Sequence, residues 1–260
     1  MRWGEMSWPE LRSVPRDRVV VLAPIAACEQ HGPHLPTLTD TILCTAVAEG
    51  VENRLADRVV LLPTLWLGAS HHHLPFGATL SLDAMDHAGL LVNLLRPVLR
   101  EGYQRLLVLN GHGGNIDTMQ VALRRLQPEF PDRLLAAASY WDLAEPELAA
   151  IAQGPRKRMG HACEFETSMM LALRPELVRP ELARDDCRAE MSELRGVLVV
   201  EDFRQRTQRG SFGYPQQASA EKGRRMLEAV IRRTVEVVEA LLRRPIPNTA
   251  TPLSNTDGDG

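Results

Sequence analysis

The sequence predicts an α/β fold whose parallel sheet is covered by helices on both faces. Short apolar runs, typical of buried strands, alternate with longer segments whose apolar residues recur at helical spacing. Helix-length segments separate successive strands, as crossovers between parallel strands require. Polar segments rich in histidine directly follow the strands, and that edge of a parallel sheet is where ligand-binding residues lie in such folds.

Four apolar runs are the expected strands of this sheet. They span residues 19–25, 59–63, 105–109 and 134–140. Each is rich in aliphatic residues and leads into a polar segment, which is the pattern of a short buried strand. A weaker run at 196–200 predicts one more strand.

The segments between and after these strands have helical periodicity. Helices are expected at about 40–55, 84–101, 143–152 and 217–243, and in segments that end near residues 126 and 173. Asp40 and Asp83 are expected to cap two of them, because an aspartate oxygen can accept a hydrogen bond from a free amide of the first turn.

Composition narrows the class of protein. The 260 residues carry a formal net charge of -3, so no basic excess points to nucleic acid or to an anionic membrane. No apolar run approaches the roughly 20 residues that span a bilayer, and the first residues lack the apolar core of a secretory signal. We expect a cytoplasmic protein with one domain at 1–244 and a disordered tail at 245–260.

The stretch 29–40, directly after the first strand, combines acids and histidines. Glu29 and His31 share one face of an extended backbone, because that face repeats every two residues. Asp40 follows a turn and could fold back as a third ligand for a divalent metal, since all three residue types bind such ions. The alternative is a polar surface loop with a chance cluster.

Two later segments carry residues of the same types. The glycine-rich stretch 110–115 lacks the lysine of a phosphate-binding loop, so His112 fits a metal ligand better than part of a nucleotide site. His161 and Glu164 are three apart at an expected helix start and so share a face, where one could ligate a metal and the other move protons. Glu166 points elsewhere and is expected to cap the helix or support a ligand. The alternatives are a histidine satisfied by hydrogen bonds and an acid-rich helix start.

About five imidazole and carboxylate ligands suggest two divalent ions that share a bridging carboxylate. Such a site lowers the pKa of bound water and polarises a carbonyl, so hydrolysis needs no protein nucleophile. The Gly-x-Ser-x-Gly elbow of serine hydrolases is absent from the sequence.

At these residues the chain resembles the creatininase family (creatinine amidohydrolase and its relatives). The matching motifs are Glu29-Gln30-His31-Gly32-Pro33-His34-Leu35-Pro36, Asn110-Gly111-His112-Gly113-Gly114-Asn115 and His161-x-x-Glu164-x-Glu166. Weaker sequence matches extend the resemblance to roughly residues 7–240. It implies a three-layer α/β sandwich with a mostly parallel central sheet, a binuclear metal site, amide hydrolysis and often a homohexamer.

The resemblance also assigns roles to residues. The implied metal ligands are Glu29, His31, Asp40, His112 and Glu164, with Asp40 bridging the two ions. Creatininase proper has a glutamate where this chain has Gly114, which cannot ligate, and Glu164 is the candidate replacement. His161 would be the catalytic proton carrier, with Glu164 beside it.

Five further positions are expected around this centre. Ser70, His73 and Trp141 follow strands and are the candidate substrate-binding residues. Asn110 and Glu166 are expected to support the ligands from behind.

These inferences predict a metal-dependent amidohydrolase that cuts a non-peptide C–N bond, in a cyclic amide or a formamide, through a metal-bridging hydroxide. Its cofactors would be two divalent ions (zinc, manganese or iron), and its partners a small amide substrate and copies of itself, with hexamers by family resemblance. Two alternatives stay open. One is a family peptidase that trims a short precursor peptide of the mycofactocin type. The other is a non-catalytic oligomeric binding module.

Overall fold

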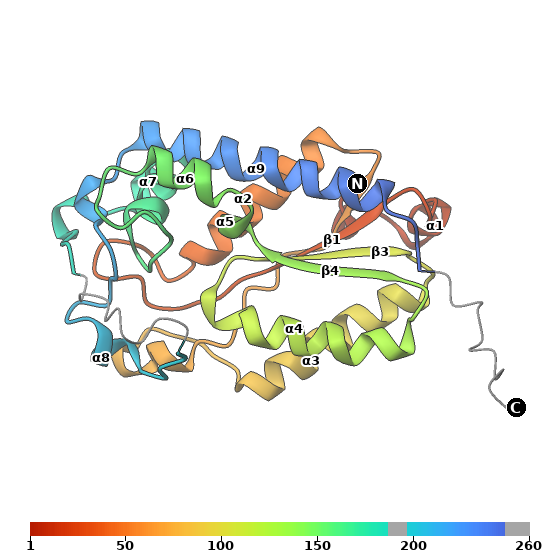
Figure 1. Cartoon of the computed structure of the whole chain (residues 1–260), viewed down its shortest axis with the longest axis horizontal. Helices are drawn as coiled ribbons and strands as arrows, with labels where there is room; N and C mark the ends of the chain where they lie inside the picture. The colour runs from red at the N-terminus through yellow and green to blue at the C-terminus, as the bar shows by residue number, and fades with distance from the viewer. Residues whose placement is uncertain (187–196, 248–260) are drawn as a thin grey trace, which may run out of the picture.

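The computed structural model describes residues 1–186 and 197–247, and in them a four-stranded sheet forms the centre of the protein (Figure 1). The strands are β1 (Val20–Ile25), β2 (Val59–Leu61), β3 (Arg105–Asn110) and β4 (Leu134–Ser139). All neighbours pair in parallel, in the order β2-β1-β3-β4. The predicted parallel α/β fold is therefore confirmed.

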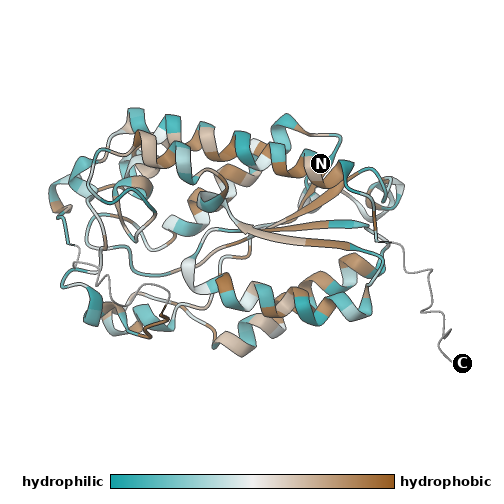
Figure 2. Ribbon diagram, viewed as in Figure 1, coloured by the Kyte–Doolittle hydropathy of each residue, from teal (hydrophilic) through white to brown (hydrophobic). Residues whose placement is uncertain are grey.

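Helices cover both faces of the sheet (Figure 1). One face carries α2 (Thr39–Arg54), α7 (Glu164–Leu173) and α9 (Ala220–Arg243), and the other carries α3 (Ala84–Arg100) and α4 (Ile116–Leu126). The strands are mostly apolar (Figure 2), and alternate residues along them enter opposite cores. Leu22 packs with the α2 and α9 side, whereas its neighbours Val21 and Ala23 pack with the α3 and α4 side.

Shorter helices complete the described chain. The α-helices are α1 (Trp8–Ser13), α5 (Tyr140–Leu143), α6 (Glu145–Ile151) and α8 (Phe203–Arg206). The 3-10 helices are η1 (Trp3–Glu5), η2 (His71–Phe76), η3 (Gly113–Asn115), η4 (Gln127–Glu129), η5 (Pro175–Leu177), η6 (Pro180–Leu182) and η8 (Pro215–Gln217). The helix expected at 143–152 is α6, and α5 overlaps that range only at Leu143. Pro146 lies in the first turn of α6, where its missing amide proton costs no helical hydrogen bond.

The sequence makes four local predictions: one strand, two helix caps and a disordered tail. The strand expected at 196–200 is wrong for residues 197–200, which are exposed, have no regular structure and pair with none of the four described strands. Residue 196 lies outside the described residues. Asp40 is not the N-cap of α2, because the helix already begins at Thr39. Asp83 does cap α3, and its side chain accepts a hydrogen bond from the Met85 amide at 2.8 Å. Most of the tail expected at 245–260 lies outside the described residues.

Helix α9 packs closely on α7 and so fixes the start of α7. A Cβ built on Gly223 would lie 1.8 Å from the Ser168 carbonyl oxygen, so only glycine permits this approach of the two backbones. The amino end of α7 bears Glu164 and Glu166. The position of both acids therefore depends on this packing.

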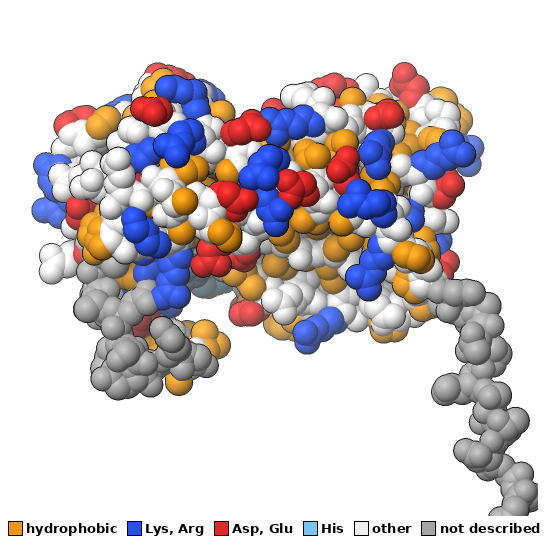
Figure 3. Space-filling model, turned by 45° about the horizontal axis from the view of Figure 1, so that its top comes forward, with side chains coloured by type: hydrophobic (Ala, Val, Ile, Leu, Met, Phe, Trp, Pro, Cys, Tyr) orange, Lys and Arg blue, Asp and Glu red, His pale blue; other side chains and the backbone are white. Residues whose placement is uncertain are grey.

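The face on which α9 lies carries charges of both signs. Figure 3 shows Lys and Arg side chains interspersed with Asp and Glu, and ion pairs such as Arg232 with Glu147 at 3.0 Å lie on it. Each helix in the described part of the chain is too short or too polar to span a membrane.

Candidate metal centre

Titratable side chains from several segments meet at the carboxyl end of the sheet. They come from the loop after β1, the start of α2, η2, the turn after β3, and the residues around the start of α7. The set is Glu29, His31, Asp40, His73, His112, His161 and Glu166, each at most 8% exposed. Buried groups of this kind need partners or bound ions, so their convergence marks a candidate site.

Three imidazoles are each held through one ring nitrogen. His31 Nδ1 and His161 Nε2 lie 3.2 and 2.8 Å from backbone carbonyl oxygens, to which they can donate. His112 Nε2 lies 3.1 Å from Ser70 Oγ. In each ring the other nitrogen faces the acids, which is how proteins fix a histidine for metal binding.

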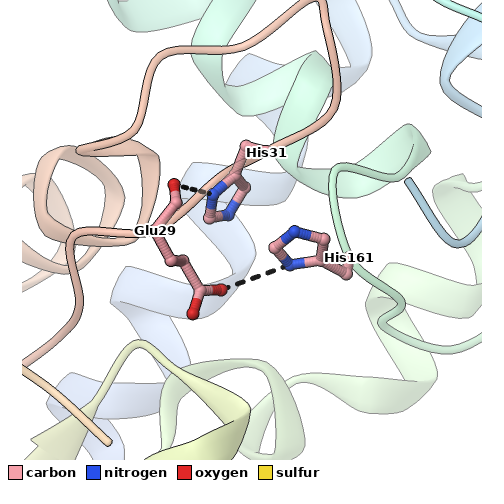
Figure 4. Close-up of side chains that lie close together, drawn as sticks. All are labelled: Glu29, His31 and His161. Carbon is pink, nitrogen blue, oxygen red and sulfur yellow. Dashed lines mark hydrogen bonds and ion pairs between the residues drawn. The ribbon is translucent and has the colours of Figure 1, made fainter. Parts of the chain in front are cut away.

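Two carboxylates lie between these free nitrogens. Asp40 Oδ1 is 3.0 Å from His31 Nε2, and Asp40 Oδ2 is 3.1 Å from His112 Nδ1. Glu29 Oε1 is 3.2 Å from His112 Nδ1 and 3.4 Å from His161 Nδ1. Figure 4 shows the Glu29 carboxylate pointing toward His161, with the His31 ring beside the Glu29 backbone. Asp40 thus faces two different imidazoles, as a bridging carboxylate would.

The donor set fits divalent metal ions. Both Glu29 carboxylate oxygens and Asp40 Oδ2 are buried without an aligned hydrogen bond, although imidazoles lie close to them. Such oxygens are costly to bury unless a cation satisfies them. Within the described residues, three sets of ligand atoms lie within 4.8 Å of one another: Glu29/His31/His161, Glu29/His72/His112 and His31/Asp40/Glu166. Mixed nitrogen and oxygen donors suit zinc, manganese and iron.

The buried acids raise the pKa of two histidines of the site. Burial disfavours the charged form of His112, but Glu29 and Asp40 outweigh it and raise the pKa of His112 to about 10. At His31 burial also opposes the charge, and Asp40 again wins and raises the pKa. Burial, helped by the positive charge of His31, instead lowers the pKa of His161. Because a metal ion binds the neutral ring, metal binding at His31 or His112 competes with protonation of that ring.

Glu166 extends this cluster. Its Oε1 lies 3.7 Å from His31 Nε2, and its Oε2 accepts a hydrogen bond from the Cys163 amide at 3.3 Å. The side chain therefore caps α7, as the sequence suggests, and at the same time faces His31, which the sequence does not suggest.

Glu164 lies in a different environment. Its Oε1 accepts from Lys222 Nζ at 2.6 Å and from the Gln153 amide at 2.8 Å, and its Oε2 accepts from the Gly154 amide at 2.7 Å. Among the described residues it belongs to none of the three sets of ligand atoms. The structure therefore does not bring Glu164 together with His31, and the carboxylate of α7 nearest to that imidazole is Glu166.

The reason lies in the backbone before α7. His161 is not on the helix: it forms an extended bridge with Phe212, and the chain then turns at Ala162, whose φ is +48°. The helix begins only at Glu164. The three-residue spacing of His161 and Glu164 therefore does not place them on one helical face.

The glycine-rich turn after β3 holds His112 in place. The Asn110 side chain donates to the His112 carbonyl at 2.7 Å and accepts from the His112 amide at 3.0 Å, which is the supporting position expected for it. A Cβ built on Gly114 would lie 2.1 Å from the Ala69 carbonyl oxygen and 2.5 Å from His112 Nε2. This backbone therefore excludes any side chain at position 114, metal ligand or not.

The three candidate substrate-binding residues lie in two different places. Ser70 is buried behind His112 with its hydroxyl on that ring, and His73 Nε2 lies 3.2 Å from Glu29 Oε1, so both stand in the cluster itself. Trp141 lies in α5 with its ring 5.2 Å from that of Tyr140.

Two residues that lie in the site are not among the site residues predicted from the sequence. His72 stacks on His112 with ring centroids 5.6 Å apart, and the run of three histidines after β2 is a signal that could have included it. Phe203 lies against His73 with centroids 4.0 Å apart. It comes from the irregular region far along the chain, and no sequence signal points to it.

Known proteins place this geometry in context. The family model described as "Creatininase: Creatinine amidohydrolase" matches residues 4–238. A mycofactocin precursor peptide peptidase of Mycobacterium ulcerans is 31% identical over 241 residues, 88% of each chain. A creatinine amidohydrolase of Pseudomonas putida is 30% identical over 252 residues, 90% of this chain and 95% of the relative. A crystal structure of creatininase has a TM-score of 0.83 at 27% identity, over 94% of this chain and 98% of its own.

The family match spans nearly the whole described chain, and the same motifs that predict the metal ligands lie within it. The fold agrees with a solved creatininase structure over 94% of this chain. The protein therefore belongs to the creatininase family of hydrolases.

Proposed function

We propose that this chain is a metal-dependent amidohydrolase that cuts a non-peptide C–N bond in a cyclic amide or a formamide. One observation carries the proposal. The Glu29 and Asp40 carboxylates are buried between imidazoles with oxygens that lack hydrogen bonds, which is a costly arrangement without cations. The non-catalytic alternative gives no reason to keep so many acids and histidines buried together.

Each residue of the centre has a role in this proposal. Glu29 and His112 would hold one ion, His31 and Glu166 the other, and Asp40 would join the two. When bound, such ions polarise a carbonyl and lower the pKa of water. Creatininase structures of Zn–Zn type and with Mn, 26% and 28% identical with TM-scores of 0.81 and 0.79, support zinc or manganese here.

His161 is the proposed proton carrier. Burial and the positive charge of His31 lower the pKa of His161, which favours the neutral ring that can accept a proton from the attacking water. Its Nε2 is held by the Gln30 carbonyl oxygen at 2.8 Å, which leaves Nδ1 as the reactive nitrogen. Nδ1 lies 3.4 Å from Glu29 Oε1 and is therefore beside the proposed metal position, where it can pass the proton to the leaving nitrogen.

The central test is metal depletion and reloading. Chelation should abolish turnover of creatinine, cyclic amides and formamides, and zinc, manganese or iron should restore it on at least one of them. Metal content is measured on the same samples. Protein that holds no metal, and gains no activity when any of the three is added, would refute the proposal.

A second candidate is a peptidase that acts on a short precursor peptide. The 31% identity to the mycofactocin precursor peptide peptidase favours it. A panel of short peptides, incubated with the metal-loaded protein beside the amides, separates the two. The expected hexamer stays a prediction, and the solution mass of the protein tests it.

One pair of variants tests whether Glu166 or Glu164 binds a metal ion. The Glu166→Gln variant should lose one of two ions per chain, because its carboxylate faces His31 at 3.7 Å. The Glu164→Gln variant should keep both, because Lys222 and two backbone amides occupy that carboxylate. Metal content after exhaustive dialysis measures both. The opposite pattern would return the ligand role to Glu164.

A further inference from the structure

Phe203 lies directly over two histidines of the centre. Its ring centroid is 4.0 Å from that of His73, with the planes 29° apart, and 4.6 Å from that of His161, which it meets edge-on at 68°. The residue is only 5% exposed. The phenyl ring therefore fills the space beside both imidazoles.

The surroundings of this ring are unusual for a buried phenylalanine. Phe203 belongs to neither of the two apolar cores that flank the sheet in the described chain. Its ring neighbours are imidazoles and the Arg206 guanidinium, whose carbon lies 5.7 Å from the ring centroid. Apolar burial in the protein core therefore does not account for its position.

Helix α8 holds the ring there. Arg204 Nε donates to the Pro75 carbonyl oxygen at 2.8 Å, and its guanidinium lies 4.8 Å from the centroid of the Phe76 ring. Asp202 caps the helix at its start. Figure 1 shows α8 beside the chain of residues 71–76, so the helix that carries Phe203 is fastened to η2, the element that carries His73.

We propose that Phe203 is a specificity-determining residue, which limits the leaving group of the substrate to a small amine. This rests on the proposed function, in which His161 gives a proton to the leaving nitrogen. That nitrogen must lie beside the His161 ring, and the next atoms of the leaving group then meet Phe203. Because packed interiors have little free volume, a bulky amine would have to displace the ring. A peptide chain on this side would have to displace α8 itself.

The experiment compares two formamides with the same acyl group and different leaving amines. Wild-type metal-loaded protein should prefer N-methylformamide to N-cyclohexylformamide. The Phe203→Ala variant should raise the ratio of kcat/KM for the cyclohexyl over the methyl substrate by about tenfold or more, the scale of selectivity that apolar pockets achieve. Phe203→Tyr keeps the ring and should leave the ratio unchanged. Phe130→Ala, which removes a ring that is 9% exposed in the α3 and α4 core, is the matched control and should also leave it unchanged.

A second readout does not depend on turnover. In metal-free protein, diethyl pyrocarbonate should label His161 and His73 faster in Phe203→Ala than in wild type or Phe130→Ala, as mass spectrometry of peptides can show. If Phe203→Ala does not fold, Phe203→Leu should shift both readouts in the same direction by less, since leucine leaves less space than alanine.

The outcomes separate the two proposals. Turnover with an unchanged substrate ratio and unchanged labelling in the folded variants would overturn the role of Phe203 alone. So would a wild-type protein that cleaves the cyclohexyl amide or a peptide better than N-methylformamide. No turnover of any amide or peptide by metal-loaded wild type would overturn the proposed function and this inference with it.

Discussion

The Asp40→Asn variant should lose both metals and at least about 10³-fold in kcat, because several kcal/mol of transition-state stabilisation by the ions would go with them. The Asp40 carboxylate faces both His31 and His112, at 3.0 and 3.1 Å. Asparagine keeps the shape but offers only one oxygen and no charge, so it cannot join two cations. Metal content and turnover after reloading measure the effect.

In metal-depleted protein, the Asp40→Asn substitution should also change the pKa of His112. Burial lowers the pKa of His112, and Glu29 and Asp40 overcome this to hold it at about 10. Removing the Asp40 charge should therefore lower the pKa of His112, while Glu29 still supports the protonated ring. Histidine resonances followed by NMR against pH report the shift. An Asp40→Asn protein that keeps two ions, or an unmoved His112 pKa, would contradict the bridging role.

The control is Asp83→Asn, which makes the same chemical change at the start of α3. There the side chain caps the helix through the Met85 amide, and asparagine caps as well as aspartate does. This variant should keep its metals and its activity. Loss of both would point to a general effect of the substitution on folding.

The sequence predicts the frame of the site because strands and their polar ends obey short-range rules. Alternation on an extended backbone places Glu29 beside His31, and parallel pairing places the β1 and β3 ends together. The Ile25↔Asn110 register then brings the loops after both strands to one edge, which is why His112 meets Glu29.

The sequence fails where side-chain direction depends on tertiary structure. The choice between Glu164 and Glu166 turns on where α7 begins and on the left-handed turn at Ala162, neither of which the residue spacing reveals. The contact of Phe203 with His73 depends on how α8 docks on η2, across a long stretch of chain without regular periodicity. Such contacts come from packing and not from local pattern.

Removing the Lys222 ammonium group from its buried pair with Glu164 should lower the stability of the protein strongly. Both side chains are at most 7% exposed, and Nζ lies 2.6 Å from Oε1. In the Lys222→Met variant the carboxylate keeps its two backbone amides but loses its counter-ion. A buried charge left in this state typically costs about 3–5 kcal/mol. For a domain of this size that is roughly 6–20 °C in melting temperature.

The double variant Glu164→Gln/Lys222→Met separates the pair from its parts. With the charge gone from both positions, much of the lost stability should return, so the two single changes should not add. Melting must be measured without metal, because a bound ion would stabilise each variant by its own affinity. If the single variants melt at the wild-type temperature, the Lys222–Glu164 pair does not stabilise the contact between α9 and α7.

This pair also bears on the metal centre. Lys222 is on α9, and through Glu164 it fastens the first turn of α7, where Glu166 lies two residues on. Lys222→Met should therefore loosen Glu166 without removing any ligand, and weaken metal affinity by about 10–100-fold, as the loss of outer supporting contacts does.

A direct ligand role for Glu164 predicts a different pattern of metal loss. Glu164→Gln would then abolish one ion outright, and the double variant would regain stability without regaining that ion. Melting temperature and metal content, measured on the same three variants, thus decide between a carboxylate that binds metal and one that positions its neighbour.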